Sequence, residues 1–280
     1  MKKADRKSGR YRKTLREQVK ENPRLAATYV ILRVLVVLVL IAQIFNRNFE
    51  NVFLCILTLI LFTIPSFIER TIHIDVPDTL EIIILLFIFA AEILGEIQAY
   101  YVHFPYWDTM LHTLNGFLCA AIGFSLLDIL TRRGSLAFQL SPLYLALVAF
   151  CFSMTIGVLW EFFECTMDQL FLLDMQKDTV VHSIGSVMLD PSGGNTPTAI
   201  QNITDVIVVT ADGTQHSLGL GGYLDIGLLD TMKDLFVNFI GAVVFSIIGY
   251  FYVKNRGQGK FARRFIPQVL PPEEPSTKEK

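Results

Sequence analysis

The chain has 280 residues, of which 52% are hydrophobic and 18% are charged, whereas an average soluble chain is about 25% charged. This balance excludes an intrinsically disordered protein and argues against an ordinary soluble domain, and four cysteines are too few for a disulfide scaffold. The formal net charge of −2 hides two basic ends, since ten of the 24 Lys and Arg residues precede Ala26 and seven follow Val253.

The N-terminal segment 1–24 is polar and basic, with ten Lys or Arg and three acidic residues. No cleaved signal peptide is expected, because this polar segment precedes the first apolar run and no small-residue cleavage site follows that run. Nucleic acid is an alternative partner for such a charge, but aromatic residues are nearly absent and an apolar stretch follows at once. We therefore expect a cytoplasmic segment that contacts anionic lipid head groups, and no nucleic-acid partner.

Six apolar stretches are long enough to cross a bilayer, whose hydrocarbon core of about 30 Å needs roughly 17 to 25 helical residues. They are 27–45, 52–68, 79–100, 109–130, 143–164 and 232–252. We therefore predict an all-α membrane protein, a bundle of six transmembrane helices with a small extracytoplasmic loop. The first five helices lie within 25–165 and the sixth within 231–253.

The positions of Lys and Arg predict the orientation, because these residues favour the cytoplasmic side of short loops. Placing both termini in the cytoplasm leaves 20 Lys and Arg residues inside, Arg33 within the first span and only Arg47, Lys177 and Lys233 outside. This partition predicts a multi-pass protein of the cell membrane. The tail 254–280, with Pro271-Pro272 and alternating charges, is expected to be a disordered cytoplasmic segment.

The segment 166–230 has a different composition, with eight Asp residues and a single Lys. Within it, the run 203–210 (ITDVIVVT) is rich in β-branched residues, and the run 214–218 (TQHSL) follows on the other side of Asp212-Gly213. An Asp-Gly pair between two such runs is typical of a β-hairpin turn. We predict an acidic extracytoplasmic loop that carries a β-hairpin.

Ionisable residues are rare inside membranes, because a charged carboxylate at the centre of the bilayer costs at least about 2.5 kcal/mol. In the predicted topology, however, acidic residues and one histidine gather near the outer ends of four helices. They are Glu96, Asp108, His112, Glu161, Glu164, Asp230 and Asp234. Glu81 lies near a cytoplasmic end, where an interfacial charge is expected.

The spacing of these residues places each set on one helix face. At about 100° per residue, Asp108 and His112 differ by roughly 40°, Glu161 and Glu164 by about 60°, and Asp230 and Asp234 by about 40°. Carboxylates that share a cavity need a counter-charge, and a divalent metal supplies it. Carboxylates with one histidine suit Mn, Fe or Zn, or Mg and Ca where fewer nitrogens bind.

Two alternatives to a metal remain open. The cluster could hold protons in a relay or a polar cavity, or its members could be solvated helix ends. The second alternative is strongest for Asp108 and Asp230, since each precedes a span and could cap its helix.

The combination of Gly95-Glu96, WDTMLH at 107–112, WEFFE at 160–164 and Asp-Thr-x-x-Asp at 230–234 resembles the YjdF-like family of predicted bacterial membrane proteins. The resemblance covers 65–252 and implies a polytopic inner or plasma membrane protein, without implying an activity. The signature positions that it implies are Glu96, Trp107, Asp108, His112, Trp160, Glu161, Glu164, Asp230 and Asp234.

The function expected from the residues is that of an enzyme, a hydrolase or transferase that acts on a lipid or its head group at the outer leaflet. A metal would polarise the substrate or activate water, and Glu161 or Glu164 would act as the base. The alternative is a transporter that passes a cation or a proton-coupled solute through the same cavity. A scaffold or sensor that uses only the loop is a third class. The sequence leaves the metal, the substrate and the oligomeric state open.

Overall fold

A computed structural model describes residues 22–72, 74–132, 140–255, 261–266 and 268–269. The chain divides into two compact units, one formed by Met1–Gly157 with Val237–Lys280 and the other by Val158–Phe236. The division falls inside two uninterrupted helices, α8 (Pro142–Phe171) and α9 (Leu228–Lys254). Most of the predicted basic segment 1–24 lies outside the described residues.

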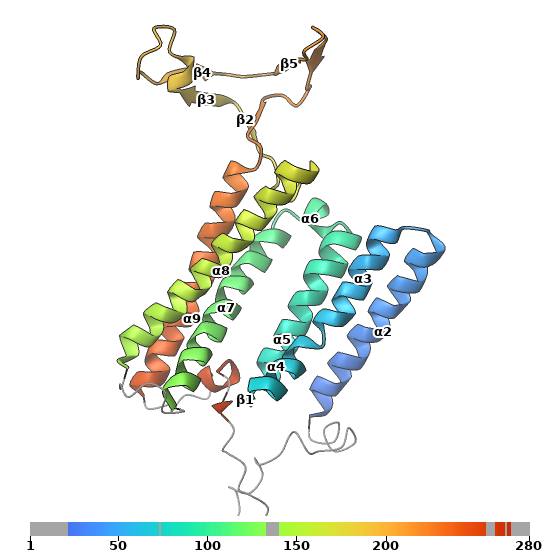
Figure 1. Ribbon diagram of the computed structural model, residues 1–280, viewed down its shortest axis with the longest axis vertical. Helices are drawn as coiled ribbons and strands as arrows, with labels where there is room; N and C mark the ends of the chain where they lie inside the picture. Colours follow the sequence, from blue (N-terminus) through green and yellow to red (C-terminus); the bar gives the residue numbers. More distant parts are fainter. Residues whose placement is uncertain (1–21, 73, 133–139, 256–260, 267, 270–280) are drawn as a thin grey trace, which may run out of the picture. The chain divides into compact units, whose positions relative to one another are not determined.

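The first unit begins with the helices α2 (Pro23–Phe45), α3 (Phe49–Leu61), α4 (Ile64–Ile72) and α5 (Asp78–Phe89). Helices α2, α3 and α5 lie side by side, and α4 follows α3 within one apolar stretch, Phe49–Glu69 (Figure 1). A proline starts α2, and the side chain of Asn48 caps α3 by accepting a hydrogen bond from the Asn51 N–H at 3.1 Å. Val36, Cys55 and Leu85 are fully buried where α2, α3 and α5 meet. Many other apolar side chains of α2 and α3 are exposed, as expected for helices that face lipid.

The third predicted span is divided between two kinds of helix. The α-helix α5 continues into a π-helix, η2 (Ala90–Ile97), and the short helix α6 (Tyr100–His103) follows. The widened turn of η2 is held by a neighbour, because the indole Nε1–H of Trp107 donates a 3.3 Å hydrogen bond to the carbonyl of Ala90. Gly95 lies against the ring of Tyr101, where a larger side chain would collide.

Five helices among the described residues are long and apolar enough to cross a membrane. They are Pro23–Phe45, Phe49–Glu69, Trp107–Leu127, Pro142–Phe171 and Leu228–Lys254. The mostly helical membrane fold is therefore confirmed. The count of six spans stays a prediction, because the stretch 79–100 is shared by α5 and η2.

Helix α7 (Trp107–Arg132) packs tightly against α9 within the first unit. Gly116 lies against the backbone of Asn238, and Gly241 lies against the carbonyl of Thr113. Two aromatic pairs further along, Phe117 with Phe245 at 5.2 Å and Phe124 with Tyr252 at 6.4 Å, advance by the same seven residues on both helices. The two helices are therefore parallel, and α8 runs in the opposite direction (Figure 1).

Two short segments that the structure describes, 261–266 and 268–269, fall within the predicted disordered tail 254–280. The short helix η4 (Ala262–Arg264) is followed by Phe265 and Ile266, which are buried against the apolar core of α7, α8 and α9. Strand β8 (Gln268–Val269) pairs in antiparallel fashion with β1 (Ile74–Asp75). The composition of the tail does not indicate these contacts, and residues 256–260, 267 and 270–280 lie outside the described residues.

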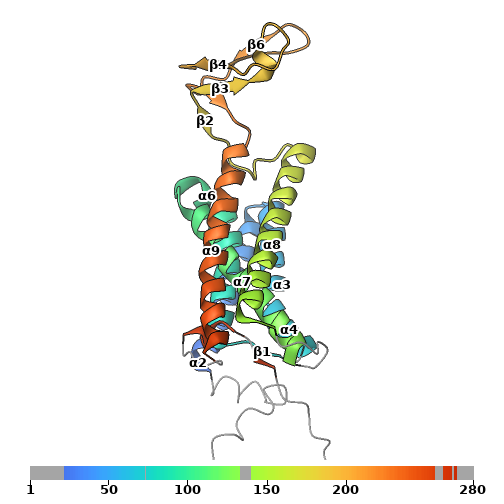
Figure 2. The ribbon, with the colours of Figure 1, turned by 90° about the vertical axis from the view of Figure 1, so that its left-hand side faces the viewer.

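The second unit contains three antiparallel strand pairs between α8 and α9. They are β2 (Val180–Val181) with β7 (Tyr223–Leu224), β3 (Ser183–Ser186) with β4 (Thr198–Gln201), and β5 (Ile207–Val209) with β6 (Gln215–Ser217) (Figure 2). A 3₁₀ turn, η3 (Val187–Leu189), follows β3. The predicted hairpin is confirmed as β5–β6, and Gly213 in its turn has a φ of +83°, which favours glycine.

Candidate metal site

In the first unit, Asp108 and His112 lie one turn apart on α7. Nε2 of His112 is 3.4 Å from Oδ1 of Asp108, and His112 is only 9% exposed. Asp108 lies in the first turn of α7, where a negative charge also interacts favourably with the helix dipole. The first turn of α7 therefore suits the charge of Asp108, and its proximity to His112 makes the two residues a candidate ligand pair.

A buried polar layer follows one turn further along α7. Asn115 Nδ2 donates to Asn238 Oδ1 at 3.3 Å, and Asn238 Nδ2 donates to the sulfur of Met154 at 3.7 Å. Asn238 is 1% exposed, and a Cβ added at Gly157 would lie 2.7 Å from its Nδ2 atom. An amide in such apolar surroundings is costly unless it is paired. These contacts fix the lateral position of α7, α8 and α9 at this level.

In the second unit, Glu161 and Glu164 lie on the last turns of α8 and are 4% and 8% exposed. The Nε1–H of Trp160 donates a 2.8 Å hydrogen bond to Oε1 of Glu164, and its ring packs on Phe163 at 5.4 Å. Trp160 therefore orients Glu164 in addition to any contact with the bilayer interface.

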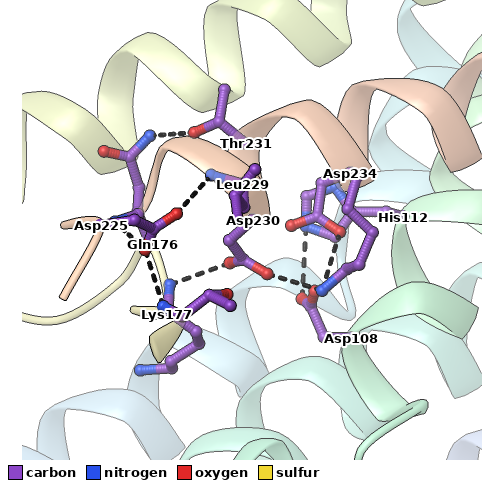
Figure 3. Close-up of polar contacts among 12 residues, drawn as sticks. Asp108, His112, Gln176, Lys177, Asp225, Leu229, Asp230, Thr231 and Asp234 are labelled. Carbon is purple, nitrogen blue, oxygen red and sulfur yellow. Dashed lines mark hydrogen bonds and ion pairs between the residues drawn. The ribbon is translucent and has the colours of Figure 1, made fainter. Parts of the chain in front are cut away.

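The acidic residues at the start of α9 are almost completely buried, with Asp230 6% and Asp234 1% exposed. The ammonium of Lys233 lies 2.6 Å from Oδ1 of Asp230 and 3.7 Å from Oδ1 of Asp234. The other oxygen of Asp230 accepts a hydrogen bond from the backbone N–H of Lys177 at 2.9 Å (Figure 3). A lysine therefore provides part of the counter-charge, and both oxygens of Asp230 are engaged.

Two further aspartates hold the chain that leaves α8 and enters α9. Asp168 accepts hydrogen bonds from the backbone N–H groups of Met175 and Gln176 at 2.7 and 2.8 Å. Asp225 accepts from Thr179 and Leu229 at 2.7 and 2.8 Å, so it caps the start of α9 (Figure 3). Burial alone would raise the pKa of Asp225. The hydrogen bonds from backbone N–H groups have the larger combined effect, so the pKa of Asp225 is lower than its ordinary value. These aspartates have structural partners and are not free for chemistry.

The candidate ligands form two sets that share His112. One contains Asp108, His112 and Asp234, and the other contains His112, Glu161 and Glu164. Within the described part of the chain, neither set includes Asp230 or Glu96. Glu96 lies on the π-helix η2 with an exposed side chain.

A buried carboxylate outside these sets was not predicted. Glu81 is 2% exposed and accepts a 2.6 Å hydrogen bond from the hydroxyl of Tyr29, which also lies 3.4 Å from the hydroxyl of Ser66. The sequence predicts an interfacial charge at Glu81, because it does not show that other helices cover this residue. The apolar residues that flank Glu81 on both sides are the one feature of the sequence that agrees with its burial.

Comparison with protein families finds a match to a family model described as a predicted membrane protein (DUF2238), which covers residues 28–255. No curated protein and no solved structure matches the chain.

Proposed function

We propose that this chain, which belongs to the DUF2238 family of predicted membrane proteins, binds a divalent cation with residues of α7, α8 and α9. The proposed ligands are Asp108 and His112 of α7, Glu161 and Glu164 of α8, and Asp234 of α9. The name YjdF-like stays a resemblance.

Helix geometry supports a common level for these side chains. His112 lies four residues before Gly116, Asp234 four residues before Asn238, and Glu161 four residues after Gly157. Each step is about one turn, roughly 6 Å along the axis and 40° around it. Because α7 and α9 are parallel and α8 runs against them, the three steps lead in the same direction from the polar layer.

The donor set supports a metal with borderline character. Four carboxylates and one imidazole suit Mn²⁺, Fe²⁺ or Zn²⁺ better than Ca²⁺ or Mg²⁺, which prefer oxygen ligands alone. Near-complete burial of Glu161, Glu164 and Asp234 supports the proposal most strongly, because buried carboxylates are costly without a cation. Asp230 is assigned a supporting role, since Lys177 and Lys233 engage both of its oxygens.

The chemistry that we propose is metal-assisted hydrolysis or transfer on a lipid or its head group. A bound divalent cation would supply a Lewis acid for the substrate or an activated water. Trp160 orients Glu164, and Glu161, three residues earlier on the same face, is the proposed base. Indole side chains such as those of Trp107 and Trp160 are typical of the bilayer interface, where a lipid head group would be reached.

A second candidate, a cation transporter, is favoured by the polar layer of Asn115, Asn238 and Ser153. Ser153 donates a 2.7 Å hydrogen bond to the carbonyl of Gly116, so polar groups continue from the candidate ligands toward the middle of the helices. Against transport, α7, α8 and α9 are uninterrupted, whereas transport sites are typically formed by broken helices. Fully buried Phe124 and Phe245 also close the packing beyond this layer.

Metal analysis of the protein purified in detergent, with melting before and after chelation, tests the site. A cation that binds only the folded state stabilises it by about 2.7 kcal/mol at a hundred times its dissociation constant. We expect stoichiometric metal in the wild type and a lower melting temperature after chelation, and no response in His112→Ala with Glu161→Gln. The control Glu50→Gln, at the exposed start of α3, should respond as the wild type does. Identical melting with and without chelator in a metal-free wild type would contradict the site.

Proteoliposomes separate the two functions. A hydrolase should change the lipids, as measured by mass spectrometry, without moving Mn²⁺ into the vesicles. A transporter should accumulate Mn²⁺ and leave the lipids intact.

We also propose that both termini lie in the cytoplasm of a cell with the acidic segment 166–230 outside, as the Lys and Arg partition indicates. A cysteine introduced at position 213 should react with an impermeant reagent added to whole cells, and one at position 5 should not. The opposite pattern would reverse the orientation.

A further inference from the structure

The lysine at the start of α9 occupies the position of a cation. Lys233 lies between two buried carboxylates, with its Nζ atom 2.6 Å from Asp230 and 3.7 Å from Asp234. The side chains of Asp230 and Asp234 are 7% and 2% exposed, whereas that of Lys233 is 44% exposed. The lysine therefore reaches from the surface to buried anions that would otherwise repel each other.

The loop after α8 keeps this arrangement in place. Asp230 is held by the backbone N–H of Lys177, and the side chain of Gln176 donates a hydrogen bond to the hydroxyl of Thr231 (Figure 3). Asp225 caps the same helix through the N–H of Leu229. Because Asp230 is fixed from the loop side, its ion pair holds Lys233 beside Asp234.

We infer that Lys233 is a resident counter-ion which an incoming metal displaces from Asp234, so that it is a specificity-determining residue of the proposed metal site. This inference rests on the proposed function. Asp234 cannot give its full charge to a metal while the ammonium lies beside it, so binding includes the cost of moving Lys233 away.

The displacement favours divalent over monovalent cations. Exchange of an ammonium for Na⁺ or K⁺ brings no additional charge to the carboxylates, so these ions gain little by displacing Lys233. A divalent cation brings one more charge and bonds several carboxylate oxygens at once, which compensates for the lost ion pair. Without the lysine, both kinds of cation should bind more readily.

Mn²⁺ binding to the full-length, chelator-stripped protein in detergent tests the inference. Lys233→Met should raise the Mn²⁺ affinity about tenfold, because the variant lacks the competing positive charge 3.7 Å from Asp234. Na⁺ should compete with Mn²⁺ in the same variant. When Na⁺ replaces a bulky organic cation at constant ionic strength, the Mn²⁺ affinity of Lys233→Met should fall, whereas that of the wild type should stay the same. Lys233→Arg keeps the charge and should resemble the wild type.

Lys177→Met is the matched control. The Lys177 side chain is 43% exposed, nearly the same as that of Lys233, but its ammonium bonds to Asp174. The Met variant keeps the backbone N–H that Asp230 uses, so its Mn²⁺ affinity should be that of the wild type.

Melting temperatures distinguish competition from a purely structural ion pair. In Lys233→Met, the metal-free protein should melt lower than the wild type and gain more on addition of Mn²⁺. Equal losses with and without Mn²⁺, or an Mn²⁺ affinity unchanged or lower than that of the wild type, would overturn the inference but leave the metal site standing. If the wild type, Lys233→Met and Lys233→Gln all fail to bind Mn²⁺, the proposed site itself is wrong, and the inference is wrong with it.

Discussion

At the scale of single residues, buried polar side chains in this protein are held by specific partners. Tyr29 donates to Glu81 at 2.6 Å, and Asn115 donates to Asn238 at 3.3 Å, in both cases between different helices. In apolar surroundings a lost partner is expensive, because the remaining group keeps its full desolvation cost. Such pairs therefore give each helix one preferred position beside its neighbours.

Removal of the Tyr29 hydroxyl tests this at the contact of α2 with α5. Tyr29→Phe keeps the ring and removes the hydrogen bond to Glu81, so we expect a loss of about 1–3 kcal/mol in the free energy of unfolding. Denaturant unfolding in detergent measures the loss. Tyr29→Phe combined with Glu81→Leu should recover part of it, because the buried carboxylate oxygen that lost the Tyr29 hydroxyl is removed as well; a double variant less stable than the single one would contradict the account.

At the scale of elements, glycines allow the close approach of α7 to α9. Gly116 and Gly241 each lie against a backbone carbonyl of the other helix, which cannot move aside as a side chain could. This approach brings Asn115 and Asn238 within hydrogen-bonding distance. In the second unit, aspartate side chains instead bond to the backbone of turns, as Asp212 does in the β5–β6 hairpin and Asp190 does after η3.

Gly116→Ala should destabilise the protein by about 1–3 kcal/mol, because the new methyl group would collide with the backbone of Asn238. Gly185→Ala in β3 is the control, since a Cβ there meets no atom within 4 Å. Thermal unfolding of both variants in the same detergent measures the difference. Equal melting temperatures would show that α7 and α9 are not in close contact at Gly116.

The turn of the β5–β6 hairpin should depend on pH. The hydroxyl of Thr210 and the N–H of Thr214 bond to Asp212 and lower its pKa from 3.8 to about 2. Because the pKa of Asp212 is lower in the folded turn than in the unfolded chain, the charged carboxylate stabilises the turn at pH values above about 4. This contribution is lost as the pH falls from about 4 through 2. The protection of the Thr214 amide from hydrogen exchange, relative to its intrinsic rate at each pH, should fall in that range, but not in Asp212→Asn. A step centred near pH 4 in the wild type would show that the aspartate is not held by these bonds.

At the scale of the whole molecule, the apolar runs predicted the helices because length and hydropathy alone decide whether a segment can cross a bilayer. The same runs could not reveal the π-helix at Ala90–Ile97, whose bonding depends on contacts such as that of Trp107 with Ala90. The burial of Phe265 and Ile266 could not be predicted for a similar reason, since it depends on residues far away in the chain.

The candidate site was predictable in part. Helical spacing identified Asp108 with His112 and Glu161 with Glu164 as residues of common faces. His112, Glu161 and Glu164 are buried, as an interior position requires, whereas Asp108 is partly exposed. Spacing could not separate Asp234 from Asp230, because the distinction depends on contacts of the folded chain, such as the hydrogen bond from the backbone N–H of the distant Lys177 to Asp230. It also could not predict that Glu96 lies on a π-helix with an exposed side chain.

Pulsed electron paramagnetic resonance of Mn²⁺ bound to protein with ¹⁵N-labelled histidine tests the central claim most directly. Direct ligation by His112 predicts a nitrogen hyperfine coupling in the wild type and in His103→Ala, but none in His112→Ala. Stoichiometric Mn²⁺ that lacks this coupling in the wild type, a coupling that persists in His112→Ala, or a wild type that binds no Mn²⁺ would contradict the proposed metal site.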